Sequence, residues 1–210
     1  MKIRTIPLAF VAVCCACNAA SEPRWAHIAR RVEAYAAHPS TENARSALSV
    51  IPVKQVSFSG YSAETEANQS IYAEKPMSVL EKQVQKRHQA SVALAFRMMN
   101  IADGAFAEDL DIIVGKLITI DPALFLEELQ NANKSDLDGL VLNLDDTYVD
   151  EMKKTCAEWL LRKKALQGVE VPGLQKIKKR AIATLNEGSS ICATQQIDPP
   201  DVSPAASGRR

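Results

Sequence analysis

Residues 76–103 read PMSVLEKQVQKRHQASVALAFRMMNIAD, the longest stretch of the chain with a sustained helical pattern. Its apolar positions recur every three or four residues, a spacing that places side chains on one side of an α-helix. Pro76 suits the first turn of a helix, and Gly104 interrupts the pattern at the other end. The pattern predicts one long amphipathic helix whose buried side carries Leu80, Val84, His88, Val92, Phe96 and Met99.

Two shorter helices are predicted before this run. Apolar residues repeat at helical spacing over residues 25–35. Pro39 ends this first helix, because the residue before a proline is disfavoured in the helical region. Ser40 or Thr41 provides the N-cap of the second helix, which Pro52 ends. Residues 52–75 lack a clear stripe, although 63–73 fit a short helix.

Helix start and stop signals continue after residue 104. Asp121 and Pro122 predict a new helix, with Asp as the cap and Pro in the first turn. Two further capping pairs are Ser135 with Asp138 and Thr147 with Asp150. Pro172 starts the last predicted helix, which ends near Gly188. Residues 140–144 also alternate between apolar and polar, so a strand is an alternative there.

The predicted fold class is all-α, a compact bundle of about seven or eight helices occupying residues 21–193. Helix, short proline-marked turn and helix follow one another repeatedly. This punctuation resembles helical repeat arrays of the HEAT type, although no fixed period is present. Residues 194–210 are rich in Ser, Pro and Gly, and we predict a disordered tail there.

Residues 1–20 have the three parts of a secretory signal peptide: a basic start, an apolar middle and small residues at the exit. The apolar part is about a dozen residues long, too short to span a bilayer. Residues 14–17 also resemble a bacterial lipoprotein box, in which Cys17 would carry the lipid. Cys14 departs from that motif, which has an aliphatic residue there. We predict export, to the periplasm or to a membrane through a lipid anchor.

Cysteine usage agrees with export. Beyond the predicted signal the chain contains two cysteines, Cys156 and Cys192. Two cysteines in an oxidising compartment predict one disulfide. Cys156 falls on the apolar side of a predicted helix, and we expect Cys192 after the last helix, so the bridge would tie a loose segment to the core. The alternative is a buried free thiol and an exposed one.

The net charge is 0, but the charges are segregated along the chain. Residues 101–150 hold twelve acidic and two basic residues, a net charge of −10, and residues 151–180 hold nine basic and three acidic residues, a net charge of +6. The segregation predicts an acidic and a basic interaction face, the basic one suited to anionic lipid or an acidic protein. The alternative is two solvated faces that partly neutralise each other. Nucleic acid is not an expected partner of an exported chain without net positive charge.

The common catalytic and cofactor motifs are missing. The sequence contains no HExxH metal motif, no GxSxG nucleophile motif and no glycine-rich phosphate loop. The stretch 131–139 fails the register of a calcium loop. We therefore expect no cofactor and no metal, and an enzyme is the less favoured class. His88 is the one acid–base candidate, and its alternative is a histidine at the edge of the core.

Aromatic residues amid small polar ones suggest a partner-binding surface in residues 52–75, at Phe58, Tyr61 and Tyr72. Their alternative is packing of a long connector onto the helices. The leading functional hypothesis is an exported, non-enzymatic protein-binding module of the bacterial cell envelope. One alternative is a periplasmic immunity or inhibitor protein. Another is an envelope hydrolase that uses His88 or carboxylates brought together by the fold.

Overall fold

The chain folds into helices alone within the part that a computed structural model describes, residues 25–56, 63–132, 137–145, 148 and 151–194. No β-strand occurs in those ranges, so the all-α prediction is confirmed and the strand alternative for 140–144 is wrong. None of the helices in those ranges has the length and apolar character needed to cross a bilayer. The predicted signal peptide with Cys17 lies outside the described residues, as do residues 195–210 of the predicted tail 194–210, whose first residue, Thr194, ends a helix.

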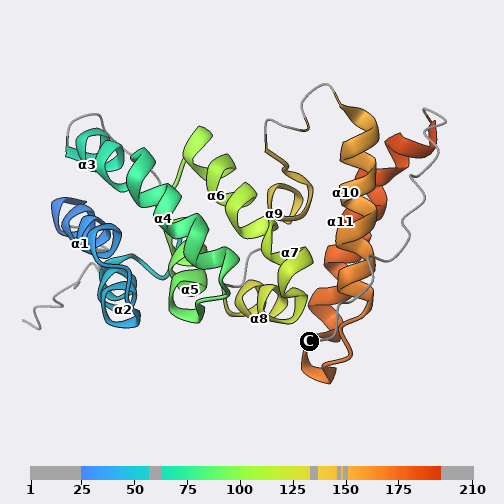
Figure 1. Ribbon diagram of the computed structural model, residues 1–210, viewed down its shortest axis with the longest axis horizontal. Helices are drawn as coiled ribbons and strands as arrows, with labels where there is room; N and C mark the ends of the chain where they lie inside the picture. Colours follow the sequence, from blue (N-terminus) through green and yellow to red (C-terminus); the bar gives the residue numbers. More distant parts are fainter. Residues whose placement is uncertain (1–24, 57–62, 133–136, 146–147, 149–150, 195–210) are drawn as a thin grey trace, which may run out of the picture.

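The helices follow one another with short connections (Figure 1). They are α1 (Trp25–Ala37), α2 (Thr41–Val50), α3 (Ala63–Ile71), α4 (Glu74–Gln85), α5 (Gln89–Met98), α6 (Ala105–Gly115), α7 (Leu117–Ile120), α8 (Pro122–Ala132), α9 (Asp138–Leu142), α10 (Met152–Gln167), a 3-10 turn (Pro172–Leu174) and α11 (Gln175–Thr194).

Two of the predicted caps stand where the sequence placed them. The Ser40 hydroxyl accepts a hydrogen bond from the Asn43 amide at 3.1 Å, and Asp121 Oδ1 accepts one from the Leu124 amide at 3.1 Å. Each satisfies an amide that has no partner inside the first turn of its helix. The predicted caps Ser135 and Thr147 lie outside the described residues, and α10 begins later, at Met152.

The single long helix predicted over 76–103 is wrong, because the run is broken into α4 and α5. The break centres on Arg87, whose φ of 59° lies in the left-handed region and reverses the chain. A straight helix of this length would extend about 42 Å. Folding it in two lets α5 pack on α4, which buries Leu80 and Phe96 in one core. His88 consequently lies in the turn before α5 and not on a helical stripe.

The end of the last helix also differs from the prediction. Helix α11 continues through Gly188 to Thr194, so Cys192 lies in the helix and not beyond it. Gly188 does not end the helix; it lies where α11 approaches α9. A Cβ atom at Gly188 would come within 2.6 Å of a methyl group of Leu142. The glycine is therefore a point of close packing between two helices.

The helices form two rows. In the first row α1, α4, α6 and α9 pack in succession, and in the second α2 packs on α5 and α5 on α8. Figure 1 shows the resulting progression along the long axis, from α1 at one end to α10 and α11 at the other. Buried residues of both rows form one core, and within the second row the rings of Phe96 on α5 and Phe125 on α8 have their centroids 6.1 Å apart. This succession of packed helices agrees with the irregular, repeat-like arrangement that the sequence suggested.

Helices α10 and α11 form an antiparallel pair that closes one end of the rows. The predicted disulfide joins them: Cys156 and Cys192 have Cα atoms 5.9 Å apart and bonded sulfurs. Arg162, only 2% exposed, donates from Nη1 to the carbonyls of Val141 at 2.8 Å and Asn143 at 3.2 Å. Since helix ends leave carbonyls without partners, Arg162 anchors the pair to the end of α9.

Candidate functional site

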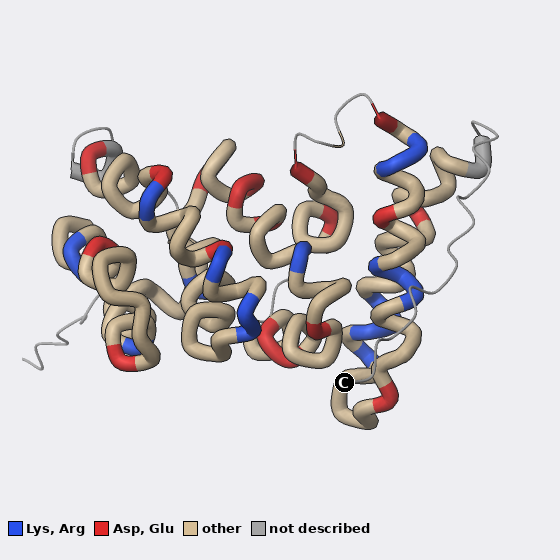
Figure 2. Tube along the Cα trace, in the orientation of Figure 1, with Lys and Arg blue, Asp and Glu red and all other residues tan. Residues whose placement is uncertain are grey.

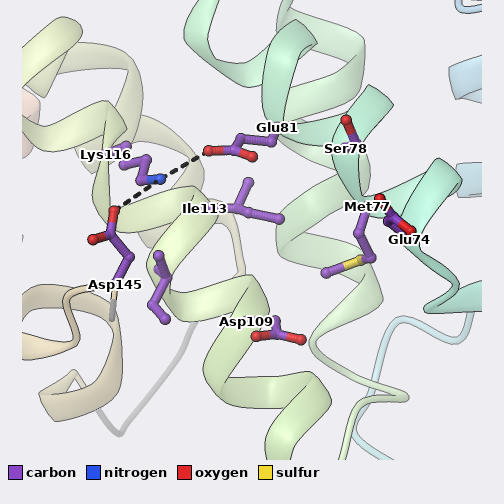
Figure 3. Close-up of a pocket in the computed structure, with 9 residues that line it drawn as sticks. Glu74, Met77, Ser78, Glu81, Asp109, Ile113, Lys116 and Asp145 are labelled. Atoms are coloured by element: carbon purple, nitrogen blue, oxygen red, sulfur yellow. Dashed lines mark hydrogen bonds and ion pairs between the residues drawn. The ribbon is translucent and has the colours of Figure 1, made fainter. Parts of the chain in front are cut away.

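A groove opens between α4 and α6 in the first row (Figure 3). Its volume is about 340 Å³. The floor is apolar and is formed by Met77 from α4 and by Ile112 and Ile113 from α6. Charged side chains from α4, α6 and the segment after α9 surround this floor.

Lys116 bridges two sides of the groove. Its Nζ atom lies 2.8 Å from Glu81 Oε1 on α4 and 3.2 Å from Asp145 Oδ2 after α9. Burial works to lower the pKa of Lys116, but its hydrogen bonds and charge interactions with Glu81 and Asp145 outweigh this penalty. The net effect raises the pKa of Lys116 above its ordinary value, so its ammonium group stays charged at neutral pH.

Two more carboxylates, Glu74 and Asp109, lie along the groove without a cation of their own (Figure 3). Within the described ranges neither forms an ion pair. Together with Glu81, Asp145 and Lys116 they give the lining a net charge of −3. An acidic rim over an apolar floor favours a cationic ligand with an aliphatic stem, such as a lysine or arginine side chain.

Neighbouring helices hold the groove in place. Trp159 of α10 donates from Nε1 to the carbonyl of Leu142 at 3.0 Å, and Arg162 holds the carbonyls beside it. Both contacts fix the end of α9, from which the chain runs directly to Asp145. Gly115 precedes Lys116 and packs beneath Arg162, since a Cβ atom there would lie 3.0 Å from Arg162 Nη1. The position of the Lys116 bridge thus depends on α10.

Of the aromatic residues predicted to bind a partner, Tyr72 is the one within the described residues, and it does not line this groove. Tyr72 is buried, 6% exposed, and stacks on Phe106 with ring centroids 4.6 Å apart. Its hydroxyl donates to the Met98 carbonyl at 3.2 Å, and burial raises the pKa of the phenol. This placement corresponds to the packing alternative for Tyr72. Phe58 and Tyr61 lie outside the described residues.

His88 belongs to a hydrogen-bonded chain that links three helices. Its Nδ1 atom lies 2.7 Å from the hydroxyl of Ser91, which accepts a hydrogen bond from the Tyr35 hydroxyl at 2.6 Å. Its Nε2 atom lies 2.9 Å from the hydroxyl of Thr41. Both ring nitrogens therefore have protein partners, and Ser91 is fully buried. The arrangement connects α1, α2 and α5, as expected of a histidine at the edge of the core.

Sequence reasoning did not find the groove residues as a site. The acidic content of 101–150 is the one signal that pointed toward it, but Glu74 and Glu81 come from another segment. Among the described residues no group of three or more His, Cys, Asp or Glu side chains is placed to hold a metal ion. Comparison of the chain with protein-family models, with curated proteins and with solved structures finds no match.

Proposed function

We propose that this protein is an exported, non-enzymatic protein-binding module of the bacterial cell envelope, and that its α4–α6 groove receives a basic segment of the partner. The observation that supports this proposal is the net charge of −3 around an apolar floor. A lysine or arginine side chain would lay its methylene groups on Met77 and Ile113 and direct its charge to Glu74 or Asp109.

The envelope location is supported by the sequence of residues 1–20 and by the Cys156–Cys192 bridge, because disulfides persist in oxidising compartments. We test it by expressing the full chain in a bacterial host and determining the N-terminus by mass spectrometry. Recovery from the periplasm beginning at Ala20 or Ser21 supports cleavage, and a lipid on Cys17 supports the anchored form. A chain that keeps Met1 in the cytoplasm contradicts export.

An immunity or inhibitor protein is the more specific form of this proposal, since an acidic groove would cover a basic site on a toxin or enzyme. The hydrolase alternative is less well supported. A general acid needs a carboxyl that holds its proton near neutral pH. Burial, with the charge of Glu127, raises the pKa of Glu128, but Glu128 lies on α8 in a separate, smaller hollow with Arg97 and Asn100.

The groove is tested with a fluorescein-labelled oligolysine peptide, with an oligoglutamate peptide as the control ligand. We expect the oligolysine peptide to bind at low salt and Glu74→Gln/Asp109→Asn to weaken it about fivefold, since each exposed ion pair contributes up to about 1 kcal/mol. The matched control is Glu42→Gln/Glu187→Gln, which removes two exposed carboxylates from other helices. Equal losses in both double variants would show attraction by overall charge and contradict the assignment of the groove.

A further inference from the structure

The outer surface of the α10–α11 pair is basic. Figure 2 shows Lys and Arg positions gathered along the lower part of this pair. The exposed basic residues are Lys153, Lys154, Lys164, Lys176, Lys179 and Arg180. The acids of this region are fewer: Glu158 contacts Arg162 at 3.3 Å, Glu151 contacts Lys154 at 2.6 Å, and Glu170 and Glu187 are exposed.

Three of these exposed lysines lie at the same end of the helix pair. Lys164 lies in the last turns of α10, and Lys176 and Lys179 lie in the first turns of α11. Because the two helices are antiparallel, these turns adjoin at one end of the pair. Within the described ranges none of the three forms an ion pair. The adjoining helix ends therefore present a concentrated positive charge.

Exposed aliphatic side chains also lie along this pair, with Met152 and Ile191 at the end opposite to these lysines. Seven large apolar side chains are exposed among the described residues, and five of them belong to this pair or its connections: Met152, Leu160, Leu161, Val171 and Ile191. Leu160 and Leu161 are 36% and 38% exposed and lie within one turn of Lys164. Leu160 and Leu161, with Val171 in the following connection, therefore supply apolar groups beside the lysines.

We propose that this face of the α10–α11 pair binds the surface of an anionic phospholipid bilayer. Lysines attract the negative headgroups, each strengthening binding about fivefold near such a surface. The aliphatic side chains beside them enter the boundary between headgroups and acyl chains. The disulfide joins α10 to α11, and Arg162 fixes α10 to the end of α9, so both helices contribute to a single contact face.

The shape and composition of this face favour a lipid surface over a protein. Neither the α4–α6 groove nor the hollow around Glu128 is lined by residues of α10 or α11. Protein interfaces are anchored by Trp, Tyr and Arg in pockets. Here Trp159 donates inward to Leu142 and Arg162 is buried, so Arg180 is the one exposed residue of these types on the described part of α10 and α11, among several lysines and aliphatic groups. Symmetric pairing of this face with the same face of a second copy would place lysines against lysines.

Binding is tested by co-sedimentation of the purified protein with vesicles. One set is pure phosphatidylcholine, and the other also contains phosphatidylglycerol. We expect binding only to the anionic set, with loss at high salt. Lys164→Gln/Lys176→Gln/Lys179→Gln should lower partitioning about 100-fold. The matched control, Lys75→Gln/Lys82→Gln/Lys86→Gln on α4 and directly after it, removes three exposed lysines and should change partitioning about twofold or less.

A second pair of variants tests the aliphatic contribution. Leu160→Ser/Leu161→Ser should reduce binding that persists at intermediate salt, whereas Val53→Ser, at a 73% exposed position elsewhere, should not. Equal binding to both vesicle sets, no binding to either, or equal losses in the two lysine triple variants would each overturn the proposal. An oligoglutamate peptide that binds through the same three lysines, without vesicle binding, would assign the face to an acidic protein instead.

Discussion

The α4–α6 groove and the outer face of the α10–α11 pair differ in charge, in shape and in what holds them in place. The groove is acidic and concave, and Lys116 bridges it with two partly exposed ion pairs. The helix pair is basic, and a disulfide and a buried arginine fix it. A chain with a net charge of 0 thus carries two surfaces of opposite sign, so its overall charge does not indicate its partners.

The two regions also differ in what stabilises them. We expect the terminal pair to depend on its covalent link, because it has packed neighbours on one side only, whereas α4 and α6 lie between neighbours in their row. In arrays of this kind, stability is approximately a sum over each unit and its contacts with adjacent units. Removing one fixing interaction should therefore weaken the end more than the middle.

The largest effect is expected from the disulfide. Cys156→Ser/Cys192→Ser opens a loop of 36 residues and should lower the free energy of unfolding by roughly 4 kcal/mol. Urea unfolding measures this loss, with the reduced wild-type protein as the control. Amide hydrogen exchange should accelerate in α10 and α11 more than in α4 and α6. If hydrogen exchange instead accelerated equally in all helices, the α10–α11 end would not depend on its fixing interactions more than the middle of the rows does.

A somewhat smaller effect is expected from Arg162. Arg162→Ala leaves the carbonyls of Val141 and Asn143 without their donor and should cost about 3 kcal/mol, because buried polar groups without partners are expensive. Arg162→Lys keeps the charge but cannot reproduce the planar fork, so an intermediate loss is expected. Thermal and urea unfolding measure both variants. A loss below about 0.5 kcal/mol for Arg162→Ala would show that α9 does not need this anchor.

The smallest effect is expected at the Lys116 bridge. A double-mutant cycle of Lys116→Met and Glu81→Gln should give a coupling free energy of about 0.2–1 kcal/mol, since both side chains are about a third exposed. The raised pKa of Lys116 sets the pH dependence: the coupling is present at neutral pH and is lost as the pH rises above the ordinary lysine value and through the raised one. Coupling that persists after lysine deprotonation would mean that packing, not charge, joins the pair.

Features that short stretches of sequence determine were predictable. Ser40 and Asp121 cap helices because a short polar side chain reaches the free amides of the next turn, whatever the rest of the fold does. The disulfide followed from cysteine number and from the predicted compartment. The all-α class followed from apolar spacing over many segments.

Features that depend on distant packing were missed. The α4–α5 break contains neither Gly nor Pro; Arg87 adopts a positive φ because the reversal brings two apolar stripes into one core. Gly188 was interpreted as a helix end, although its role is contact with Leu142 of another helix. The groove carboxylates Glu74, Glu81, Asp109 and Asp145 come from separate segments, and no local spacing relates them.

The two rows also bear on the rate of folding. Each helix packs chiefly on helices that precede or follow it closely in the chain, as α1 does on α2, α3 and α4. The contact order is therefore low, and helical proteins with low contact order fold in microseconds to milliseconds. The contact between α10 and α11 is also local in sequence, so this pair can form whichever part of the array folds first. The disulfide then closes between helices that are already in contact, and refolding of the reduced chain needs no guidance from it.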